Sequence, residues 1–464
     1  MEPMLSGTWS GKKVTVLGLG RSGSSAAAYL LKHGATVLVS ESSLADGVKA
    51  DEVKHLKELG AKVETGGHSD EAIESADLIV ISPGIPPSSA PVKKARSLGK
   101  EVICDIELAY RERGEVKIIG ITGTNGKSTT CAMTSYMLES AGFSAPACGN
   151  FGVPILDQLQ TKPDFLVAEV SSYQLHYCPT FAPEIGVWLN LTPDHIEWHG
   201  SLEAYIEDKK KLFLNQTPDQ YAVLNDDDLV VANFQPPSEI FPFSVEQDED
   251  SAIQAAYMDG DHLCYRIYGA TKLVCDRSEL KIIGKHNLEN VLATISVAAI
   301  LDVPHEKIAY AVTSFKALEH RLEFAGTVDG VDFYNDSKAT NPTSTIKALE
   351  AFGTRKVVLI AGGRDKGTSL AELVSAAKDH ASEVILLGEA KERFRMAFEE
   401  GGMQNLHSVN SLDEAVELGE SLKKGPVVLS PACASFDMFK DYEERGRVFK
   451  NLVRARLEKV APSH

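Results

Sequence analysis

A glycine-rich loop that ends in a lysine and a hydroxyl residue is the first feature that could do chemistry. The segment VKIIGITGTNGKSTTCAMTSYML reads as strand, loop and helix, with Gly126, Lys127 and Ser128 where the helix begins. In such loops, backbone N–H groups cradle phosphate oxygens, the lysine reaches the terminal phosphates and the hydroxyl binds Mg²⁺. Ile121 stands where the usual pattern has its first glycine, so a glycine turn without a ligand is the alternative. The strand–loop–helix order favours a triphosphate, with contacts from Gly123, Thr124, Asn125, Gly126, Lys127, Ser128 and Thr129.

A second glycine-rich loop lies earlier in the chain, where Gly18, Gly20 and Gly23 spell G-x-G-x-x-G. It follows an apolar run, opens an Ala/Leu-rich helix and leads to a strand that ends at Glu41, which is the setting of a dinucleotide fingerprint. The pattern predicts a diphosphate at a helix N-terminus and does not name the base. An NAD-dependent oxidoreductase is therefore one alternative, but a dehydrogenase has no need of the triphosphate loop.

Two residues at the carboxyl ends of predicted strands could bind the metal ion. Glu169 ends the apolar run FLVAEV, and His195 follows the run IGVWLN within TPDH. Ligands of α/β sheets collect at this edge, and Mg²⁺ or a similar ion takes hard oxygens or imidazole. A lone histidine is more often structural, and a carboxylate there often caps a helix. The position after each strand favours metal ligands.

The segment SLEAYIEDKKKLF carries three consecutive lysines, a pattern that usually marks a solvated helix face. Helical spacing separates the three. Lys209 lies on one stripe with the apolar residues, whereas Lys210 and Lys211 are turned about 100° and about 200° away. Burial is expected to lower the pKa of Lys209 and to favour its neutral amine. The apolar residues of the stripe are Leu202, Tyr205, Ile206, Leu212 and Phe213.

Length and composition bound the class of protein. The 464 residues are too many for one core, and a net charge of −18 argues against nucleic-acid or anionic-membrane partners. Seven scattered cysteines, no apolar leader at the N-terminus and no long apolar run predict a cytoplasmic protein without membrane insertion.

Short Val/Ile-rich runs alternate with helical segments along nearly the whole chain, which predicts an α/β fold with parallel sheets. The expected domains are a Rossmann-like domain over 1–112, a P-loop ATPase-like domain over 113–317, and a second Rossmann-like domain over 318–464. The polar, acidic stretch 226–276 predicts a small additional antiparallel sheet in the central domain.

The loop GITGTNGKST resembles the ATP loop of the Mur ligases and of their folylpolyglutamate synthase relatives. Further motifs match that family in order along the chain. The third-domain segment DSKATNP, and the absence of DNPR, resemble the branch of the family that adds D-glutamate; a sibling adding another amino acid is the alternative. The matching motifs are GNFGVP from Gly149, EVSSYQL from Glu169, LNLTPDHIEWHGSLEAYIEDK from Leu189, GKHNLENVLA from Gly284, EHRLE from Glu319, DSKATNPTST from Asp336, GGRDKG from Gly362 and LSPACASFD from Leu429.

The resemblance implies an ATP-driven amide synthesis on UDP-N-acetylmuramoyl-L-alanine, through an acyl phosphate and a tetrahedral intermediate, by a monomer. It implies two Mg²⁺ sites, a CO₂-derived carbamate on Lys209, and catalytic roles for Lys127, Glu169, His195 and Lys209. Ser128, Glu169, His195 and carbamylated Lys209 are the expected metal ligands.

The remaining expected contacts fall into three groups. Asn287 and Asn290 lie three apart on one helix face and could contact the nucleoside, although a polar helix start is the alternative. Arg321 could bind phosphate in bidentate fashion, with a surface ion pair as the alternative. By resemblance, Asp336 and Lys338 also face ATP. The expected UDP-sugar contacts are Gly20, Arg21, Ser22, Glu41, Ser42, Ser82, Pro83, Gly84, Asn150, Ser171, Gln174 and His195, and the expected D-glutamate contacts are Thr340, Lys366, Ser435, Phe436 and Tyr442.

Overall fold

The computed structural model describes residues 9–44, 50–246 and 253–460, and it has the expected α/β architecture with three sheets. The chain divides into two compact units, Met1–Ser278 with Glu289–Thr313, and Glu279–Leu288 with Ser314–His464. The first unit holds two of the sheets and the second unit holds the third. Among the described residues, no helix combines the length and the apolar character needed to cross a bilayer.

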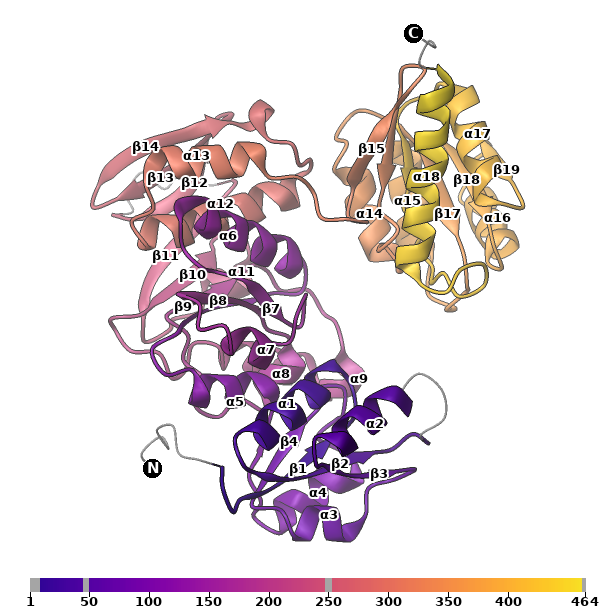
Figure 1. Cartoon of the computed structure of the whole chain (residues 1–464). Coiled ribbons are helices and arrows are strands. Elements are labelled where there is room, and N and C mark those ends of the chain that lie inside the picture. The colour runs from indigo at the N-terminus through magenta and orange to yellow at the C-terminus, as the bar shows by residue number, and fades with distance from the viewer. Residues whose placement is uncertain (1–8, 45–49, 247–252, 461–464) are drawn as a thin grey trace. The chain divides into compact units, whose positions relative to one another are not determined.

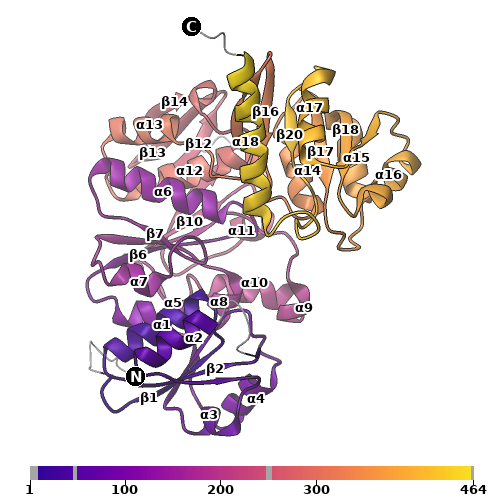
Figure 2. The ribbon, with the colours of Figure 1, turned by 45° about the vertical axis from the view of Figure 1, so that its right-hand side comes forward.

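The first sheet has five parallel strands in the order β3-β2-β1-β4-β5. Helices α1 and α2 cover one face and α3 and α4 the other (Figures 1 and 2). Because the strand order reverses at β1, the loop after β1 lies at the switch point where such sheets bind ligands. The elements are β1 (Lys13–Leu17), α1 (Arg21–Lys32), β2 (Thr36–Glu41), α2 (Ala50–Glu58), β3 (Lys62–Thr65), α3 (Asp70–Glu74), β4 (Leu78–Ile81), α4 (Ala90–Ser97), β5 (Val102–Ile103) and α5 (Asp105–Glu112).

The second sheet has nine strands in the order β14-β13-β12-β11-β10-β9-β6-β8-β7. Strand β6 lies between β8 and β9, and all three run parallel, so their carboxyl ends meet at one edge. The elements are β6 (Lys117–Thr122), α6 (Lys127–Ala141), β7 (Ala147–Gly149), α7 (Ile155–Leu159), β8 (Phe165–Glu169), α8 (Ser172–His176), β9 (Ile185–Trp188), α9 (Ile196–His199), α10 (Leu202–Lys210), β10 (Tyr221–Asn225), α11 (Leu229–Ala232), β11 (Glu239–Ser244), β12 (Ala255–Asp259), β13 (His262–Ile267), β14 (Ala270–Asp276), the 3₁₀ turn η1 (Arg277–Glu279), α12 (Lys285–Ile300) and α13 (His305–Ser314).

The antiparallel strands expected within 226–276 are present, but they do not form a sheet of their own. Strand β12 pairs parallel with β11, and β12, β13 and β14 then pair antiparallel. The meander therefore extends the parallel sheet at its far edge, away from β6 and β8.

The third sheet has the order β15-β16-β20-β17-β18-β19, with β15 and β16 as an antiparallel hairpin. Alternate residues of β17 serve opposite faces, as strand geometry requires. Leu359 and Ala361 pack in a cluster with residues of α14, α15 and α16, whereas Val358 and Ile360 pack with residues of α17 and α18. The elements are β15 (Glu323–Val328), β16 (Val331–Asn335), α14 (Pro342–Glu350), β17 (Val357–Gly362), α15 (Ala371–His380), β18 (Ala381–Leu387), α16 (Lys391–Glu400), β19 (Leu406–Ser408), α17 (Leu412–Leu422), β20 (Val427–Leu429) and α18 (Tyr442–Val460).

Candidate active site

The loop between β6 and α6 is built to present backbone N–H groups at a helix start. Gly126 is the N-cap of α6 with φ of +85°, and a Cβ there would lie 2.3 Å from Asn290 Oδ1. Only glycine therefore fits between the loop and α12 without displacing Asn290. Asn290 also accepts a hydrogen bond from Thr130 Oγ1 at 3.0 Å, so this asparagine packs against the loop from α12.

Two lysines converge on one carbonyl of this loop. Lys127 Nζ donates to Gly123 O at 2.8 Å and to Thr124 O at 2.9 Å. Lys209 Nζ donates to the same Gly123 O at 2.9 Å. Two amines from different helices therefore lie beside the phosphate loop, where charge on a terminal phosphate could be neutralised.

The prediction that Lys209 points inward is confirmed. Its side chain is 1% exposed, although the helix α10 that carries it ends one residue later. Burial, with the positive charge of Lys127, lowers the pKa of Lys209 well below its ordinary value. The neutral amine is therefore favoured, because burial penalises the charged form.

Glu169 and His195 both lie at the carboxyl edge formed by β8 and β9. Glu169 is 3% exposed, and its Oε1 accepts from Asn150 Nδ2 at 2.8 Å. Its Oε2 is buried without a hydrogen-bond partner among the described residues. A buried carboxylate oxygen without a partner is costly, and a cation would satisfy it.

His195 has the backbone geometry of a constrained site residue. Its φ of +55° and ψ of +27° are left-handed, which is uncommon for a non-glycine residue. Burial lowers its pKa, and the charge of Lys127 acts in the same direction, against the opposing effect of Asp194. The neutral imidazole that results is the form that binds metals. The donor set at this edge, a carboxylate and a neutral imidazole with the Ser128 hydroxyl, therefore fits a hard divalent cation.

The two lysines that follow Lys209 differ from each other. Lys210 pairs with Glu207 at 2.7 Å on the outer face of the helix. Lys211 is not simply solvated, because its Nζ lies 2.8 Å from Oδ1 of the buried Asp208. Asp208 also accepts from His176 Nδ1 and His199 Nδ1, each at 2.9 Å. One carboxylate thus ties α8, α9 and α10 together.

The glycine-rich loop after β1 is held in place by close packing at Gly23 and by hydrogen bonds to Glu41 at the end of β2. Gly23 must lack a side chain, because a Cβ there would lie 2.1 Å from Gly18 O. Glu41, 5% exposed, accepts from Leu19 N at 2.7 Å and from Ser43 N at 2.9 Å. The Glu41 carboxylate therefore clamps the loop after β1 to the end of β2.

The other residues expected near the UDP-sugar come from both sheets of the first unit. Arg21 Nη1 reaches Gly152 O at 3.2 Å, and Ser22 bonds the buried Asp105. Ser171 and Gln174 form a capping box at the start of α8, and Gln174 Nε2 also donates to Asp105 at 3.1 Å. Ser42 bonds Glu41, Ser82 bonds Gly18 O, and Gly20, Pro83 and Gly84 lie in the loops after β1 and β4.

The residues expected to hold D-glutamate and part of ATP follow neighbouring strands of the third sheet. Strand β20 lies between β16 and β17, all parallel, so their carboxyl ends share one edge. Burial raises the pKa of Asp336 to about 7, and its Oδ2 accepts from Ser430 Oγ at 2.7 Å. Lys338 Nζ lies 5.5 Å from the centre of the Tyr442 ring, and Lys366 Nζ donates to Thr340 O at 2.9 Å. Ser435 is buried, whereas Phe436 is 63% exposed.

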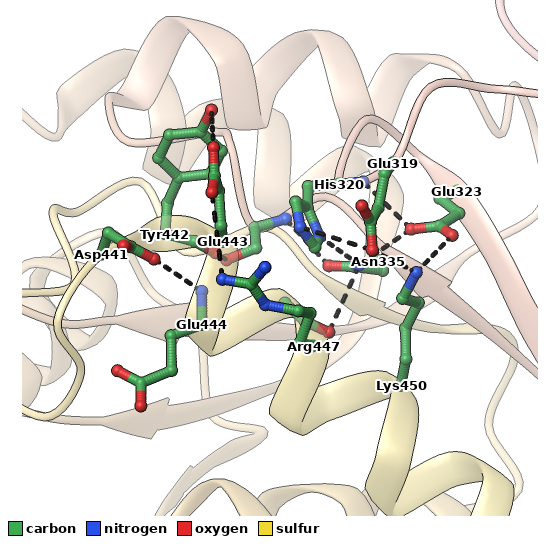
Figure 3. A network of polar contacts seen from close by, with 12 residues as sticks. Glu319, His320, Glu323, Asn335, Asp441, Tyr442, Glu443, Glu444, Arg447 and Lys450 are labelled. Carbon is green, nitrogen blue, oxygen red and sulfur yellow. Dashed lines mark hydrogen bonds and ion pairs between the residues drawn. The ribbon is translucent and has the colours of Figure 1, made fainter.

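Arg321 lies in the turn between Glu319 and Glu323, and an ion-pair network of these two carboxylates with Lys450 holds that turn (Figure 3). Its neighbours His320 and Leu322 have left-handed φ values of 67° and 42°. Lys450 Nζ bonds Glu319 Oε1 at 2.7 Å and Glu323 Oε1 at 2.8 Å. Glu319, His320 and Glu323 lie close enough to bind a metal ion, but the Lys450 ammonium already pairs with both carboxylates. Strain of this kind collects at functional sites.

Comparison with known proteins decides the family. Residues 121–298 match the Mur ligase middle domain, 320–433 the Mur ligase glutamate ligase domain, and 12–104 the N-terminal domain of MurD-like Mur ligases. A protein of Pelotomaculum thermopropionicum named UDP-N-acetylmuramoylalanine–D-glutamate ligase is 39% identical over 452 residues, covering 95% of this chain and 97% of the relative. A Koribacter versatilis protein of the same name is 40% identical, and the match covers 97% of this chain and 98% of the relative. The chain belongs to the Mur ligase family.

Solved Mur ligases share the fold. The UDP-N-acetylmuramate–alanine ligase of Thermotoga maritima superposes with a TM-score of 0.58 at 18% identity, covering 96% of this chain and 99% of that one. MurF of Acinetobacter baumannii superposes with a TM-score of 0.57 at 17% identity, covering 97% of this chain and 91% of that one. Membership of the Mur ligase family decides between the ligase and dehydrogenase alternatives in favour of the ligase.

Asn190 is a residue of this Mur ligase that sequence reasoning missed. Its Oδ1 accepts from Thr124 N at 3.1 Å and Asn125 N at 2.9 Å, and its Nδ2 donates to Asn125 O at 3.2 Å. Asn190 follows β9, inside the matched motif that begins at Leu189. A polar residue just after a predicted strand could have indicated a role at this edge of the sheet. Asn190 fixes the phosphate loop to the neighbouring strand.

Replacing Asn190 with alanine is expected to raise the KM for ATP about tenfold, because a loop held by fewer hydrogen bonds is less well ordered for phosphate. Steady-state kinetics at varied ATP measure this. Asn233→Ala is the control, since Asn233 is exposed and its Nδ2 bonds only Leu229 O. An unchanged KM in Asn190→Ala would show that the loop keeps its shape without Asn190.

Proposed function

We propose that this chain joins D-glutamate to UDP-N-acetylmuramoyl-L-alanine with consumption of ATP, in the synthesis of peptidoglycan precursors. The observation that carries the proposal is that Lys127 and Lys209 both donate to Gly123 O of the phosphate loop. On the neighbouring strand β8, Glu169 Oε2 is buried and has no hydrogen-bond partner among the described residues. Relatives that bear the name of this activity cover nearly the whole chain at 39–40% identity. The cytoplasm is the expected compartment, which agrees with seven buried cysteine thiols, and a monomer is the expected state.

The first chemical step brings two anions together. The alanyl carboxylate attacks the γ-phosphorus of ATP, the bond to ADP breaks, and an acyl phosphate forms. Lys127 reduces the negative charge at the γ-phosphate, and the N–H groups at the start of α6 hold the phosphate oxygens in line. Glu169, His195 and Ser128 would hold Mg²⁺, which supplies further positive charge when bound.

The second step makes the amide. The amine of D-glutamate attacks the acyl carbon, and phosphate leaves the tetrahedral intermediate. A positive side chain and hydroxyl groups suit an amino-dicarboxylate, and Lys366, Thr340, Ser435 and Tyr442 supply them, with Phe436 beside them. Asp336, Lys338, Arg321, Asn287 and Asn290 are assigned to ATP.

Lys209 is proposed to carry a carbamate. Its neutral amine attacks CO₂, an N–C bond forms, and a proton passes to water. The product replaces a cation with an oxygen ligand, which would serve a second Mg²⁺. The lowered pKa and complete burial of Lys209 support this assignment.

The first sheet is proposed to bind the UDP end of the substrate. Its loop presents the helix start of α1, with Gly20, Arg21 and Ser22, to a diphosphate. The clamped Glu41 supports this choice over NAD, because its carboxylate already holds the backbone of Leu19 and Ser43. Ser42, the Ser82–Gly84 turn, Asn150, Ser171, Gln174 and His195 complete the proposed contacts.

D-Glutamate, and not L-glutamate, lysine or diaminopimelate, is expected to drive phosphate release from ATP with UDP-N-acetylmuramoyl-L-alanine. The reason is the third-domain segment DSKATNP with Lys366 and Ser435 at the same sheet edge. Phosphate release with each amino acid in turn is the measurement. Comparable turnover with diaminopimelate would assign the chain to a sibling activity.

A further inference from the structure

A pocket of about 450 Å³ lies away from the phosphate loop, on the first compact unit. Its lining carries four basic side chains, Arg96, Lys100, His176 and Lys211, and none of its lining residues is acidic. The whole chain carries a net charge of −18, so a concentration of basic groups in one cavity is unusual for this protein. The volume falls in the range of small-molecule sites, and it exceeds the space that a bare oxyanion needs.

The basic side chains are held in place by other groups and still have N–H groups to offer. Lys100 Nζ donates to Glu74 O at 2.8 Å and Ala76 O at 2.7 Å, and Lys211 Nζ contacts Asp208 and donates to His176 O at 3.1 Å. Each ammonium has three N–H groups, which leaves one for a ligand. Positions fixed in advance lower the entropy cost of binding.

At the pocket, Arg96 on α4 meets His176 on α8, so the contact links a helix of the first sheet to a helix of the second. Arg96 Nη2 lies 3.0 Å from His176 Nε2, and His176 Nδ1 bonds the buried Asp208. Hydrogen bonds from His176, His199 and Lys211 hold the pKa of Asp208 below its ordinary value, against the opposing effect of burial. Asp208 is therefore an anion behind the pocket.

The charges set the kind of ligand. Arg96, Lys100 and Lys211 are three permanent cations that line the pocket, and Asp208, which pairs with Lys211, offsets one of them. An excess of two positive charges therefore remains. A phosphate monoester near neutral pH carries close to two negative charges and offers three acceptor oxygens. Val102 and Leu214, the latter 54% exposed, line the same pocket and give an organic group apolar surface to contact.

We propose that the pocket lined by Arg96, Lys100, His176 and Lys211 binds a small organic phosphate monoester, with its phosphate among the basic groups and its organic part against Val102 and Leu214. None of the residues that line this pocket is among those assigned to ATP or to the UDP-sugar. The pocket adjoins α10, the helix that carries Lys209, through Lys211 and Asp208.

Calorimetric titration of the full chain with phenyl phosphate tests the proposal, with inorganic phosphate as the second probe. Arg96→Gln with Lys100→Gln is expected to weaken phenyl phosphate binding about tenfold or more, since hydrogen bonds to a charged group are lost. Lys93→Gln is the control, because Lys93 is an exposed lysine of the same helix α4 outside the pocket. The single variant Arg96→Gln alters an exposed side chain and provides the same comparison with less risk to folding.

Three results would overturn the site. The first is equal phenyl phosphate affinity in the wild type and the double variant. The second is an equal loss in Lys93→Gln, which would indicate general charge attraction. The third is binding of inorganic phosphate as tight as that of phenyl phosphate, which would remove the role of the apolar side chains. Heat that remains in the double variant reports the phosphate loops elsewhere in the chain.

Discussion

Replacing Lys127 with alanine is expected to lower turnover by about 10²- to 10³-fold, the range seen when a group that stabilises developing charge is removed. Lys127 Nζ lies on the carbonyls of Gly123 and Thr124, at the start of the helix that faces the phosphates. Binding of UDP-N-acetylmuramoyl-L-alanine is expected to stay unchanged, because its UDP end is assigned to the loop after β1. ATP turnover and calorimetry with the UDP-sugar measure the two effects.

Lys117→Ala is the matched control for this experiment. Lys117 begins the same strand whose other end leads to Lys127, and its side chain is exposed. It should keep full turnover. A loss of UDP-sugar affinity in Lys127→Ala as large as the loss of rate would contradict the separation of the two nucleotide sites.

Replacing Lys209 with alanine is expected to abolish measurable turnover. The substitution removes the buried amine that bonds Gly123 O and, as proposed, the carbamate oxygens for a second metal ion. Lys210→Ala is the control, because Lys210 pairs with Glu207 outside the helix's buried face and should leave turnover unchanged. Thermal unfolding of both variants checks that the loss is not a loss of folding.

The carbamate itself has a separate test. Wild-type protein in buffer freed of CO₂ should lose activity and regain it when bicarbonate is added, whereas Lys209→Ala should respond to neither change. A ¹³C carbamate signal should appear in the wild type after labelling with bicarbonate and be missing from Lys209→Ala. Full activity of Lys209→Ala, or a labelled signal that persists in that variant, would show that another group has the role.

Features set by local periodicity could be predicted from the sequence. The phosphate loop needs glycines at fixed positions before a helix, and Lys209 shares a helical stripe with apolar residues; both follow from the order of neighbouring residues. The alternation of strands and helices likewise predicted an α/β fold with parallel sheets. The antiparallel strands were expected too, but their continuity with the main sheet depends on pairing between β11 and β12, which no local pattern encodes.

Features that depend on contacts between distant segments could not be predicted. Asn190 holds the phosphate loop because β9 lies beside β6 in a register that pairs Thr122 with Trp188. Glu41 is an expected UDP-sugar contact, and no local pattern shows that its carboxylate also accepts a hydrogen bond from Leu19 N in the loop after β1. The anionic Asp208 lies in a charged stretch of sequence, and only packing of α8 and α9 against α10 shows that it is buried.

Because Lys127 and Lys209 share the carbonyl oxygen of Gly123, a change in the hydrogen bonds of one lysine affects the other. Lys127 and Lys209 both donate to this oxygen, so a phosphate that draws Lys127 away leaves the carbonyl to Lys209 alone. Burial is the main cause of the lowered pKa of Lys209, and the charge of Lys127 is the second cause. If Lys127 moves away, the pKa of Lys209 rises. If nucleotide binds as proposed, nucleotide binding and the chemical state of Lys209 would be thermodynamically linked, and reciprocity would require each to change the equilibrium of the other by the same factor.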